Sequence, residues 1–214
     1  MNKFEFGKIT LYNEDCLKYL KKFPDKHFEL AIVDPPYGIN VNHNMGRRKN
    51  NKKSSYAKVD WDTEAPSLEY FNELFRVSNN QVIWGANHFI DKIPIASSCW
   101  LIWDKLFSNK VSFASAELAW TSFNSTVKRF ALSSRDKNRI HPTQKPVELY
   151  EWILNNYAKA GDRILDTHLG SASSAIAAYN LGFEFTGLEI NKDYYDSLLA
   201  RFSNCTRYDY TFND

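Results

Sequence analysis

The sequence predicts an α/β fold with a largely parallel sheet, formed as a single domain. Short apolar runs alternate along the chain with segments whose apolar residues recur at helical spacing, a pattern typical of parallel sheets. The 214 residues are enough for one domain with an ordinary core. We find no internal repeat and no sign of a second unit, so one domain over residues 1–214 is expected.

The first predicted elements are a strand, a helix and a second strand. Residues 9–12 predict a strand that ends at polar residues. Residues 16–23 carry Leu17, Leu20 and other apolar side chains at helical spacing, and a Pro-Asp pair closes this helix. Residues 28–33 form an apolar run that predicts a buried strand.

The middle of the chain predicts one helix and four strands. The helix covers residues 67–77, whose apolar side chains share one face. Short apolar runs then predict strands at residues 81–84 and 100–103, and a later pair at residues 117–123 and 126–130.

The last third returns to a regular alternation. Pro146 stands in the first turn of a predicted helix, where proline is tolerated, and a Gly-Asp pair ends that helix. A strand at residues 163–166, a helix at 173–181, a strand at 183–188 and a final amphipathic helix at 194–202 follow.

Composition excludes several classes of protein. No run of about 18 apolar residues exists, so no membrane span is expected, and the N-terminus lacks the apolar core of a signal peptide. Cys16, Cys99 and Cys205 are far apart and odd in number, which favours reduced thiols over a disulfide frame. The histidines and cysteines show no metal-ligand spacing. We therefore expect a cytoplasmic protein without a metal site.

Charge is unevenly distributed although the net charge is only +2. The polar stretch from residue 40 to about 58 has no apolar period and predicts a mobile loop. Basic residues are concentrated there, which favours binding to phosphates. They are Arg47, Arg48, Lys49, Lys52, Lys53 and Lys58.

The most unusual segment is Asp34-Pro35-Pro36-Tyr37, which follows the buried strand at residues 28–33. Proline fixes φ and forces the residue before it into an extended shape, so this turn is stiff. The Asp34 carboxylate and the Pro35 carbonyl can then point at one amine, with the flat face of Tyr37 nearby. Two acceptors and a stacking surface suit a planar base that bears an exocyclic amino group.

A second constellation joins a predicted strand to a predicted helix at residues 165–174. Its small residues allow close approach of a ligand, and the helix N-terminus offers free N–H groups. Glu189 lies 19 positions beyond Gly170, at the end of the next strand. Nucleotide-binding sheets place an acid there for ribose hydroxyls. Alone, the glycine loop is a weak signal.

Together these segments resemble the beta class of DNA amino-methyltransferases, particularly small enzymes of phage and prophage type. The catalytic turn comes first and the cofactor loop last, which is the permuted order of that class. The resemblance runs roughly from Lys8 to Phe202. Its further segments are Asn13-Glu14-Asp15-Cys16-Leu17, Trp84-Gly85-Ala86-Asn87-His88-Phe89, Trp103-Asp104-Lys105 and His141-Pro142-Thr143-Gln144-Lys145-Pro146.

The resemblance implies a Rossmann-like, circularly permuted S-adenosylmethionine-dependent methyltransferase fold, with helices on both faces of the sheet. It implies methyl transfer from S-adenosylmethionine to adenine N6 of a base flipped out of double-stranded DNA, because Asp at position 34 is typical of the adenine enzymes. It also implies DNA methylation within a restriction-modification or phage setting, a target-recognition region at about 104–140 that is short for the class, and a homodimer as one possible assembly.

The resemblance also implies three sets of site residues. The catalytic set is Asp34, Pro35, Pro36 and Tyr37. The cofactor-binding set is Asp15, Cys16, Asp34, Thr143, Lys145, Asp166, Thr167, His168, Gly170, Ser171, Ala172, Glu189 and Ile190, with Thr143 and Lys145 at the methionine end. The nucleic-acid-binding set is Arg47, Arg48, Lys49, Lys52, Lys53 and Lys105.

Several alternatives stay open. Leu169 and Ala172 depart from the expected glycine-rich loop, which weakens the expected cofactor binding. Ala172 keeps a non-catalytic nucleic-acid-binding subunit open as an alternative, although the intact turn at Asp34 to Tyr37 and Glu189 argue against it. Cytosine-N4 methylation of DNA and adenine methylation of RNA fit the same catalytic turn. A dinucleotide-dependent oxidoreductase is supported only by the glycine loop and Glu189. His141 and His168 are interpreted as structural histidines, since methyl transfer needs no general base there.

Overall fold

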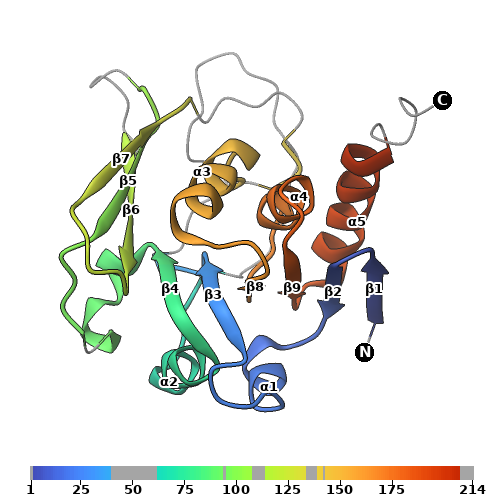
Figure 1. The fold of residues 1–214 in the computed structure, drawn as a ribbon, viewed down its shortest axis with the longest axis horizontal. Helices are drawn as coiled ribbons and strands as arrows, with labels where there is room; N and C mark the ends of the chain where they lie inside the picture. The colour runs from blue at the N-terminus through green and yellow to red at the C-terminus, as the bar shows by residue number, and fades with distance from the viewer. Residues whose placement is uncertain are drawn as a thin grey trace.

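The computed structural model describes residues 2–39, 62–93, 95–107, 114–133, 139–141 and 143–207. Within them the chain forms one nine-stranded sheet in the order β1-β2-β9-β8-β3-β4-β6-β5-β7 (Figure 1). The predicted α/β class with a mostly parallel sheet is confirmed. The predicted loop at residues 40–58 lies outside the described residues, and the predicted target-recognition region is described only in part.

Every strand and helix expected from the sequence is present. The strands are β1 (Asn2–Phe6), β2 (Ile9–Asn13), β3 (Phe28–Val33), β4 (Ser78–Trp84), β5 (Trp100–Asp104), β6 (Ala116–Thr121), β7 (Lys128–Ala131), β8 (Arg163–Asp166) and β9 (Glu184–Glu189). The helices are α1 (Cys16–Leu20), α2 (Leu68–Val77), α3 (Val147–Tyr157), α4 (Ser173–Asn180) and α5 (Lys192–Arg207), with short 3₁₀ turns at Ala86–His88 and Ile90–Lys92.

Strand β1 was not expected from the sequence. Its side chains are exposed or half-buried, and it pairs antiparallel with β2 at the edge of the sheet. The strands join at Gly7, whose φ of +57° is a left-handed conformation that glycine adopts without strain. An exposed edge strand carries few buried apolar side chains, so the sequence pattern did not predict β1.

Most strands run in one direction. Neighbouring pairs from β2 through β9, β8 and β3 to β4 are parallel, and β5 pairs parallel with β7. Only β1 and β6 run against the others among the described strands. A parallel sheet of this kind needs cover on both faces.

Helices cover both faces of the sheet, as expected. Helices α1 and α2 lie on one face, and α3, α4 and α5 lie on the other (Figure 1). Apart from Glu29, strand β3 is apolar because its side chains enter both layers. Leu30 and Ile32 pack in the layer with α3 and α4, whereas Ala31 and Val33 pack in the layer with α2.

The position of β8 brings the two sequence constellations together. Strand β8 pairs parallel with β3, through Leu30 with Ile164 and Ala31 with Leu165. The carboxyl ends of both strands therefore meet at one edge of the sheet. Open α/β sheets bind ligands at that edge.

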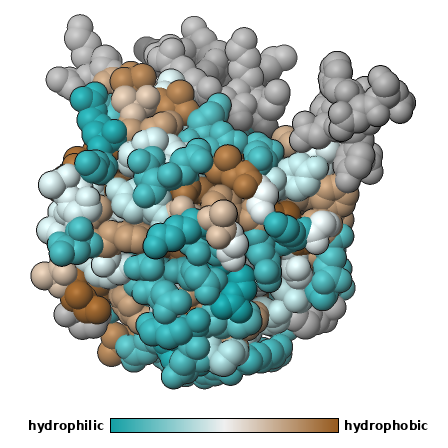
Figure 2. Space-filling model, in the orientation of Figure 1, coloured by the Kyte–Doolittle hydropathy of each residue, from teal (hydrophilic) through white to brown (hydrophobic). Residues whose placement is uncertain are grey.

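Hydrophilic side chains cover much of the face seen in Figure 2, with apolar ones between them in small separate areas. In the described segments, no helix has the length and apolar character needed to cross a bilayer.

Candidate active site

A cavity of about 250 Å³ opens at the carboxyl edge of the sheet. Its wall comes from the start of α1, from the turns after β3, β8 and β9, from the segment before α3, and from single residues of α3, α4 and α5. The residues expected there from the sequence that line it are Asp15, Cys16, Asp34, Pro36, Thr143, Lys145, Thr167, His168, Gly170, Ser171, Glu189 and Ile190. The wall also contains Glu14, His141, Gln144, Tyr150, Leu169, Ser173, Asn191 and Tyr194, which were not in the expected sets.

Asp166 and Ala172 were expected to bind the cofactor, but neither lines the cavity. The Asp166 carboxylate is buried, where it accepts hydrogen bonds from Ser174 Oγ at 2.5 Å and from the backbone N–H of His168 at 2.9 Å. Burial raises its pKa to about 7. Ala172 is also buried, with a left-handed φ of +60° directly before α4. Both residues are therefore buried beneath the loop and support its conformation.

Glu189 ends β9 with its carboxylate at the cavity wall. Its Oε2 accepts the backbone N–H of Gly170 at 3.0 Å, and its Oε1 accepts that of Asn191 at 2.9 Å. Burial raises the pKa of Glu189 to about 7, although these backbone donors act in the opposite direction. Each carboxylate oxygen has a second acceptor position, so the side chain can also accept from a ligand hydroxyl.

Asp15 caps α1. Its Oδ1 accepts the backbone N–H of Lys18 at 2.9 Å, which satisfies one of the free donors at the helix start. Its other oxygen is left for a ligand on the same wall, so capping and ligand contact are compatible.

His168 belongs to a chain of polar contacts beneath the cavity. Tyr70 Oη lies 2.6 Å from Thr167 Oγ1, which lies 2.9 Å from His168 Nδ1. His168 Nε2 lies 3.9 Å from the sulfur of Cys16. Burial lowers the pKa of His168 to about 4 and raises that of Cys16 to about 12, so both groups are neutral at physiological pH. Tyr70 comes from α2 and was missed by the sequence analysis.

His141 packs edge-on against Tyr194, with ring centroids 4.4 Å apart. Its Nδ1 lies 3.1 Å from Thr143 Oγ1. Burial, and then the charges of Lys145 and Arg139, lower its pKa to about 4, so the ring is neutral at physiological pH. A neutral, packed imidazole suits the structural role that was expected.

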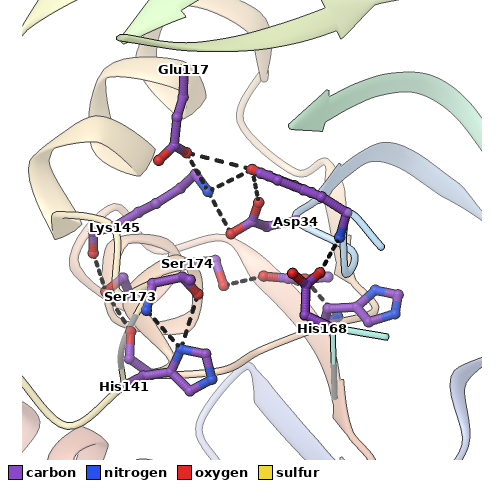
Figure 3. Close-up of polar contacts among 12 residues, drawn as sticks. Asp34, Glu117, His141, Lys145, His168, Ser173 and Ser174 are labelled. Carbon is purple, nitrogen blue, oxygen red and sulfur yellow. Dashed lines mark hydrogen bonds and ion pairs between the residues drawn. The ribbon is translucent and has the colours of Figure 1, made fainter. Parts of the chain in front are cut away.

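The catalytic turn meets Lys145 from the segment before α3. Tyr37 Oη donates to Asp34 Oδ1 at 2.8 Å, and Lys145 Nζ lies 2.5 Å from Asp34 Oδ2 and 3.3 Å from Tyr37 Oη (Figure 3). The sequence suggested that Lys145 holds the methionine end of the cofactor. Its side chain lines the cavity, but its ammonium group points at the carboxylate of Asp34.

Glu117 of β6 joins the same group of charges (Figure 3). Its Oε2 lies 2.9 Å from Lys145 Nζ and 3.5 Å from Tyr37 Oη, and its Oε1 lies 2.5 Å from Lys105 Nζ. Lys105 was expected to bind nucleic acid, and in the structure its ammonium faces this carboxylate. Glu117 was missed because a single acid within a strand pattern carries no local signal.

The three central groups shift one another's pKa values. Burial raises the pKa of Asp34, while the Lys145 ammonium opposes that shift. Burial alone would lower the pKa of Lys145, but Asp34 and Glu117 outweigh it and raise the pKa. Burial likewise disfavours ionised Glu117, yet Lys145 and Lys105 lower its pKa to about 2. Lys145 and Glu117 are therefore both charged at neutral pH.

Three neighbours hold Tyr37 in place. The buried Asp62 carboxylate accepts the backbone N–H of Tyr37 at 2.6 Å and that of Gly38 at 3.0 Å. Gly85 has a φ of +69°, and a Cβ built there would lie 2.0 Å from the Tyr37 ring, so only glycine fits. The exposed ring of His88 stacks on Tyr37, with centroids 5.0 Å apart and planes 17° apart.

The remaining predicted nucleic-acid-binding residues lie outside the described part of the chain. They are Arg47, Arg48, Lys49, Lys52 and Lys53.

Sequence comparison identifies related proteins. A family model described as DNA methylase matches residues 83–200, more than half of the chain. YubD of Escherichia coli (strain K12), whose name describes it as a methylase, is 22% identical over 203 residues, which is 85% of this chain and 84% of that protein.

Solved structures share the fold. The crystal structure of the M1.HpyAVI complex with S-adenosylmethionine matches with a TM-score of 0.63 and 21% identity, over 90% of this chain and 99% of that one. The cytosine-N4-specific PvuII DNA methyltransferase matches with a TM-score of 0.61 and 13% identity, over 94% of this chain and 90% of that one.

Proposed function

The chain belongs to the family of DNA methylases that modify base amino groups, and on that premise we propose that it methylates adenine N6 in duplex DNA. The methyl donor of this family is S-adenosylmethionine. The observation that carries the proposal is the placement of Asp34. Asp34 directly follows β3 and lines the same cavity as Gly170 and Glu189.

The wall of the cavity fits S-adenosylmethionine by its chemistry. The Glu189 carboxylate suits the two ribose hydroxyls, and Asp15 suits the amino edge of an adenine. The backbone at Thr167, Gly170 and Ser171 suits the polar methionine end. When bound, the donor supplies a methyl group activated by a positively charged sulfur.

Asp34 would act on the acceptor amine. The lone pair of an aryl amine is delocalised into its ring, which makes the amine a poor nucleophile. Hydrogen bonds from the amino group to the Asp34 carboxylate and the Pro35 carbonyl favour a tetrahedral nitrogen with a localised lone pair. Positive charge then develops on that nitrogen, and a fixed carboxylate nearby stabilises it.

Tyr37 would bind the extruded base. The target nitrogen of a stacked duplex is out of reach, so the base must leave the stack at a cost of a few kcal/mol. Stacking on Tyr37 offsets part of that cost. In the free protein the imidazole of His88 lies nearly parallel to the Tyr37 ring, with centroids 5.0 Å apart, which supports a stacking role for the phenol.

The choice of base rests on Asp34. Asp at this position is typical of adenine enzymes in the class that the chain resembles. Cytosine N4 is the second candidate, because one similar structure is a cytosine-N4-specific enzyme. Cytosine has the same arrangement of an exocyclic amine beside a ring nitrogen.

Contact with DNA would come from the basic stretch at residues 47–53, because the Lys105 ammonium pairs with Glu117 at 2.5 Å and only 14% of the Lys105 side chain is exposed. Neutralised phosphates make binding strongly salt-dependent. We expect binding to duplex DNA to weaken linearly with the logarithm of salt concentration.

One experiment tests the reaction and the base together. Purified protein is incubated with methyl-labelled S-adenosylmethionine and mixed-sequence duplex DNA, and the digested DNA is analysed for modified nucleosides. We expect labelled N6-methyladenine. Labelled N4-methylcytosine would show that cytosine is the target base, and the proposed role of Asp34 would stay the same. Label in RNA but not in duplex DNA, or no donor binding at all, would overturn the proposal.

A further inference from the structure

Glu117 has no part in the reaction described above, yet it lies within two contacts of Asp34. It comes from β6, whereas Asp34 follows β3 and Lys145 precedes α3. Lys145 Nζ lies between the two carboxylates, 2.5 Å from Asp34 Oδ2 and 2.9 Å from Glu117 Oε2. Three elements that are remote in sequence thus place a second negative charge beside the catalytic one (Figure 3).

All three N–H donors of Lys145 have an acceptor. These are Asp34, Glu117 and, at 3.3 Å, Tyr37 Oη. The ammonium also lies over the rings of Trp84, 5.4 Å from the centroid, and of Tyr37, 5.8 Å away. With only 2% of its side chain exposed, Lys145 is held in one place by these neighbours.

Lys145 alone would weaken Asp34 as a catalyst. Its positive charge opposes the effect of burial and favours the ionised carboxylate, but it also neutralises the charge that must stabilise a cation forming on the base amine. A carboxylate bound to a single ammonium is a weaker acceptor for a further N–H donor. A second anion on the far side of the ammonium removes this conflict, because the ammonium is then shared.

We propose that Glu117 is a positioning residue for methyl transfer, which shares the Lys145 ammonium with Asp34 and so keeps Asp34 a strong acceptor for the target amine. This inference rests on the proposed function. Glu117 does not line the cavity, and its shorter contact is with Lys145 at 2.9 Å, against 3.5 Å to Tyr37 Oη, so we assign its effect to Lys145. Tyr37 and Lys145 each use one acceptor position of the Asp34 oxygens, and a second position on each oxygen stays available to the base.

The electrostatics agree in sign with this role. The charge of Glu117 raises the pKa of Asp34, which makes that carboxylate more basic. Lys105 in turn pairs with Glu117 on the side away from Asp34 and helps to lower the pKa of Glu117 to about 2. Charges therefore alternate in sign from Asp34 through Lys145 and Glu117 to Lys105.

The first test compares Glu117→Gln with Glu117→Asp under single-turnover conditions. We expect Glu117→Gln to lower the methylation rate by about 10- to 100-fold, below the loss typical of a directly acting group, with the Kd for S-adenosylmethionine within twofold of wild type. Glu117→Asp keeps the charge and should recover part of the rate. Equal rates for the two variants, or a wild-type rate for Glu117→Gln, would overturn the inference.

The second test asks whether Glu117 acts through Lys145. In a Lys145→Met background, adding Glu117→Gln should change the rate by less than threefold, because the shared ammonium is already gone. The same loss with and without Lys145 would overturn the inference. Thermal unfolding and donor binding establish that each variant is folded, and the comparison of Glu117→Gln with Glu117→Asp decides the matter if Lys145→Met does not fold.

Glu29→Gln is the matched control. Glu29 is also a strand glutamate with a pKa of about 2, held by Arg163, but it lies in β3 at the end away from Asp34. Its replacement should leave the methylation rate unchanged. The proposed function fails separately, when the wild-type protein itself labels no DNA base. In that outcome both ideas fall, whereas an active wild type with a fully active Glu117→Gln removes only the role of Glu117.

Discussion

Lys145 Nζ lies 2.5 Å from Asp34 Oδ2, although the two residues are 111 positions apart in the chain. The contact joins the turn after β3 to the segment before α3. It places a positive charge next to the carboxylate that, in our proposal, accepts a hydrogen bond from the amino group of the target base. The chemistry of Asp34 therefore depends on groups outside its own motif.

Loss of Asp34 should nearly abolish methylation. Asp34→Ala removes the acceptor for the target amine, and the loss of one preorganised electrostatic partner typically lowers the rate about 100- to 1000-fold. Single-turnover transfer of labelled methyl to DNA measures the effect. The matched control is Asp25→Ala, which removes an exposed ion pair with Arg76 and should leave the rate unchanged. A wild-type rate in Asp34→Ala would refute the assignment.

Gly85 should tolerate no side chain. A Cβ at this position would lie 2.0 Å from the Tyr37 ring, so Gly85→Ala must displace Tyr37 and break its hydrogen bond to Asp34. Gly182 has a similar φ of +75°, but a Cβ at that position would meet nothing within 4 Å. Replacing Gly182 by alanine therefore measures the cost of the backbone conformation without a steric clash. We expect Gly182→Ala to lower the free energy of unfolding by about 1 kcal/mol, with full activity.

For Gly85→Ala we expect an additional loss of about 1–3 kcal/mol from overpacking, together with reduced methylation. Denaturant unfolding and single-turnover rates measure both quantities. Equal losses of unfolding free energy and equal methylation rates in the two variants would show that displacing the Tyr37 ring affects neither stability nor activity.

Donor affinity should depend on pH through Glu189. Its pKa is about 7 in the free protein because the side chain is buried, so the carboxylate gains a proton as pH falls below 7 and loses one acceptor position. The Kd for S-adenosylmethionine should therefore rise as pH falls from 8 to 6, by at most about tenfold per pH unit. Isothermal titration calorimetry measures it.

Glu189→Gln should bind more weakly at pH 8 and lose most of this pH dependence. The amino group of the ligand titrates equally in both experiments and cancels in the comparison. Asp166 also has a pKa of about 7, so the slope that remains in the variant comes from Asp166 together with the amino group of the ligand. An unchanged slope and an unchanged Kd would remove Glu189 from the donor site.

Ala172 should prove nearly neutral to replacement by glycine. Ala172→Gly relieves a left-handed φ of +60°, worth about 1–2 kcal/mol, but it also adds backbone freedom to the unfolded chain and removes a buried methyl group. These effects largely cancel, and we expect a change below about 1 kcal/mol in the free energy of unfolding. Donor affinity should stay within twofold, because Ala172 does not line the cavity.

Ala177→Gly is the control for Ala172. Ala177 is equally buried but lies inside α4, where glycine is about 1 kcal/mol worse than alanine and the lost methyl adds about 0.8 kcal/mol. Denaturant unfolding should separate the two variants by more than about 1 kcal/mol, on the same grounds. Tenfold tighter donor binding in Ala172→Gly would show that alanine obstructs the site.

Apolar spacing was enough to predict the helices and every strand except the exposed β1, because the apolar side chains of these elements form the two layers of the core. Motif residues such as Asp34 and Glu189 could also be placed, since Asp34 directly follows a buried strand and Glu189 ends one. The ion pairs of Lys145 could not be predicted, because Asp34 and Glu117 belong to parts of the chain that are distant from Lys145 in sequence. Glu117 carries no local signal at all, and its importance appears only when β6 lies beside β4.

The sheet order has a consequence for how the molecule forms. Strands β2 and β3 are close in sequence, yet β9 and β8 lie between them and are synthesised much later. Until those strands arrive, β2 and β3 each expose an unpaired edge, and such edges favour aggregation. Contacts between distant parts of a chain also slow folding. A nascent chain that already carries Asp34 therefore lacks the strand that ends in Glu189, and the cavity at the edge of the sheet is complete only after Glu189 leaves the ribosome.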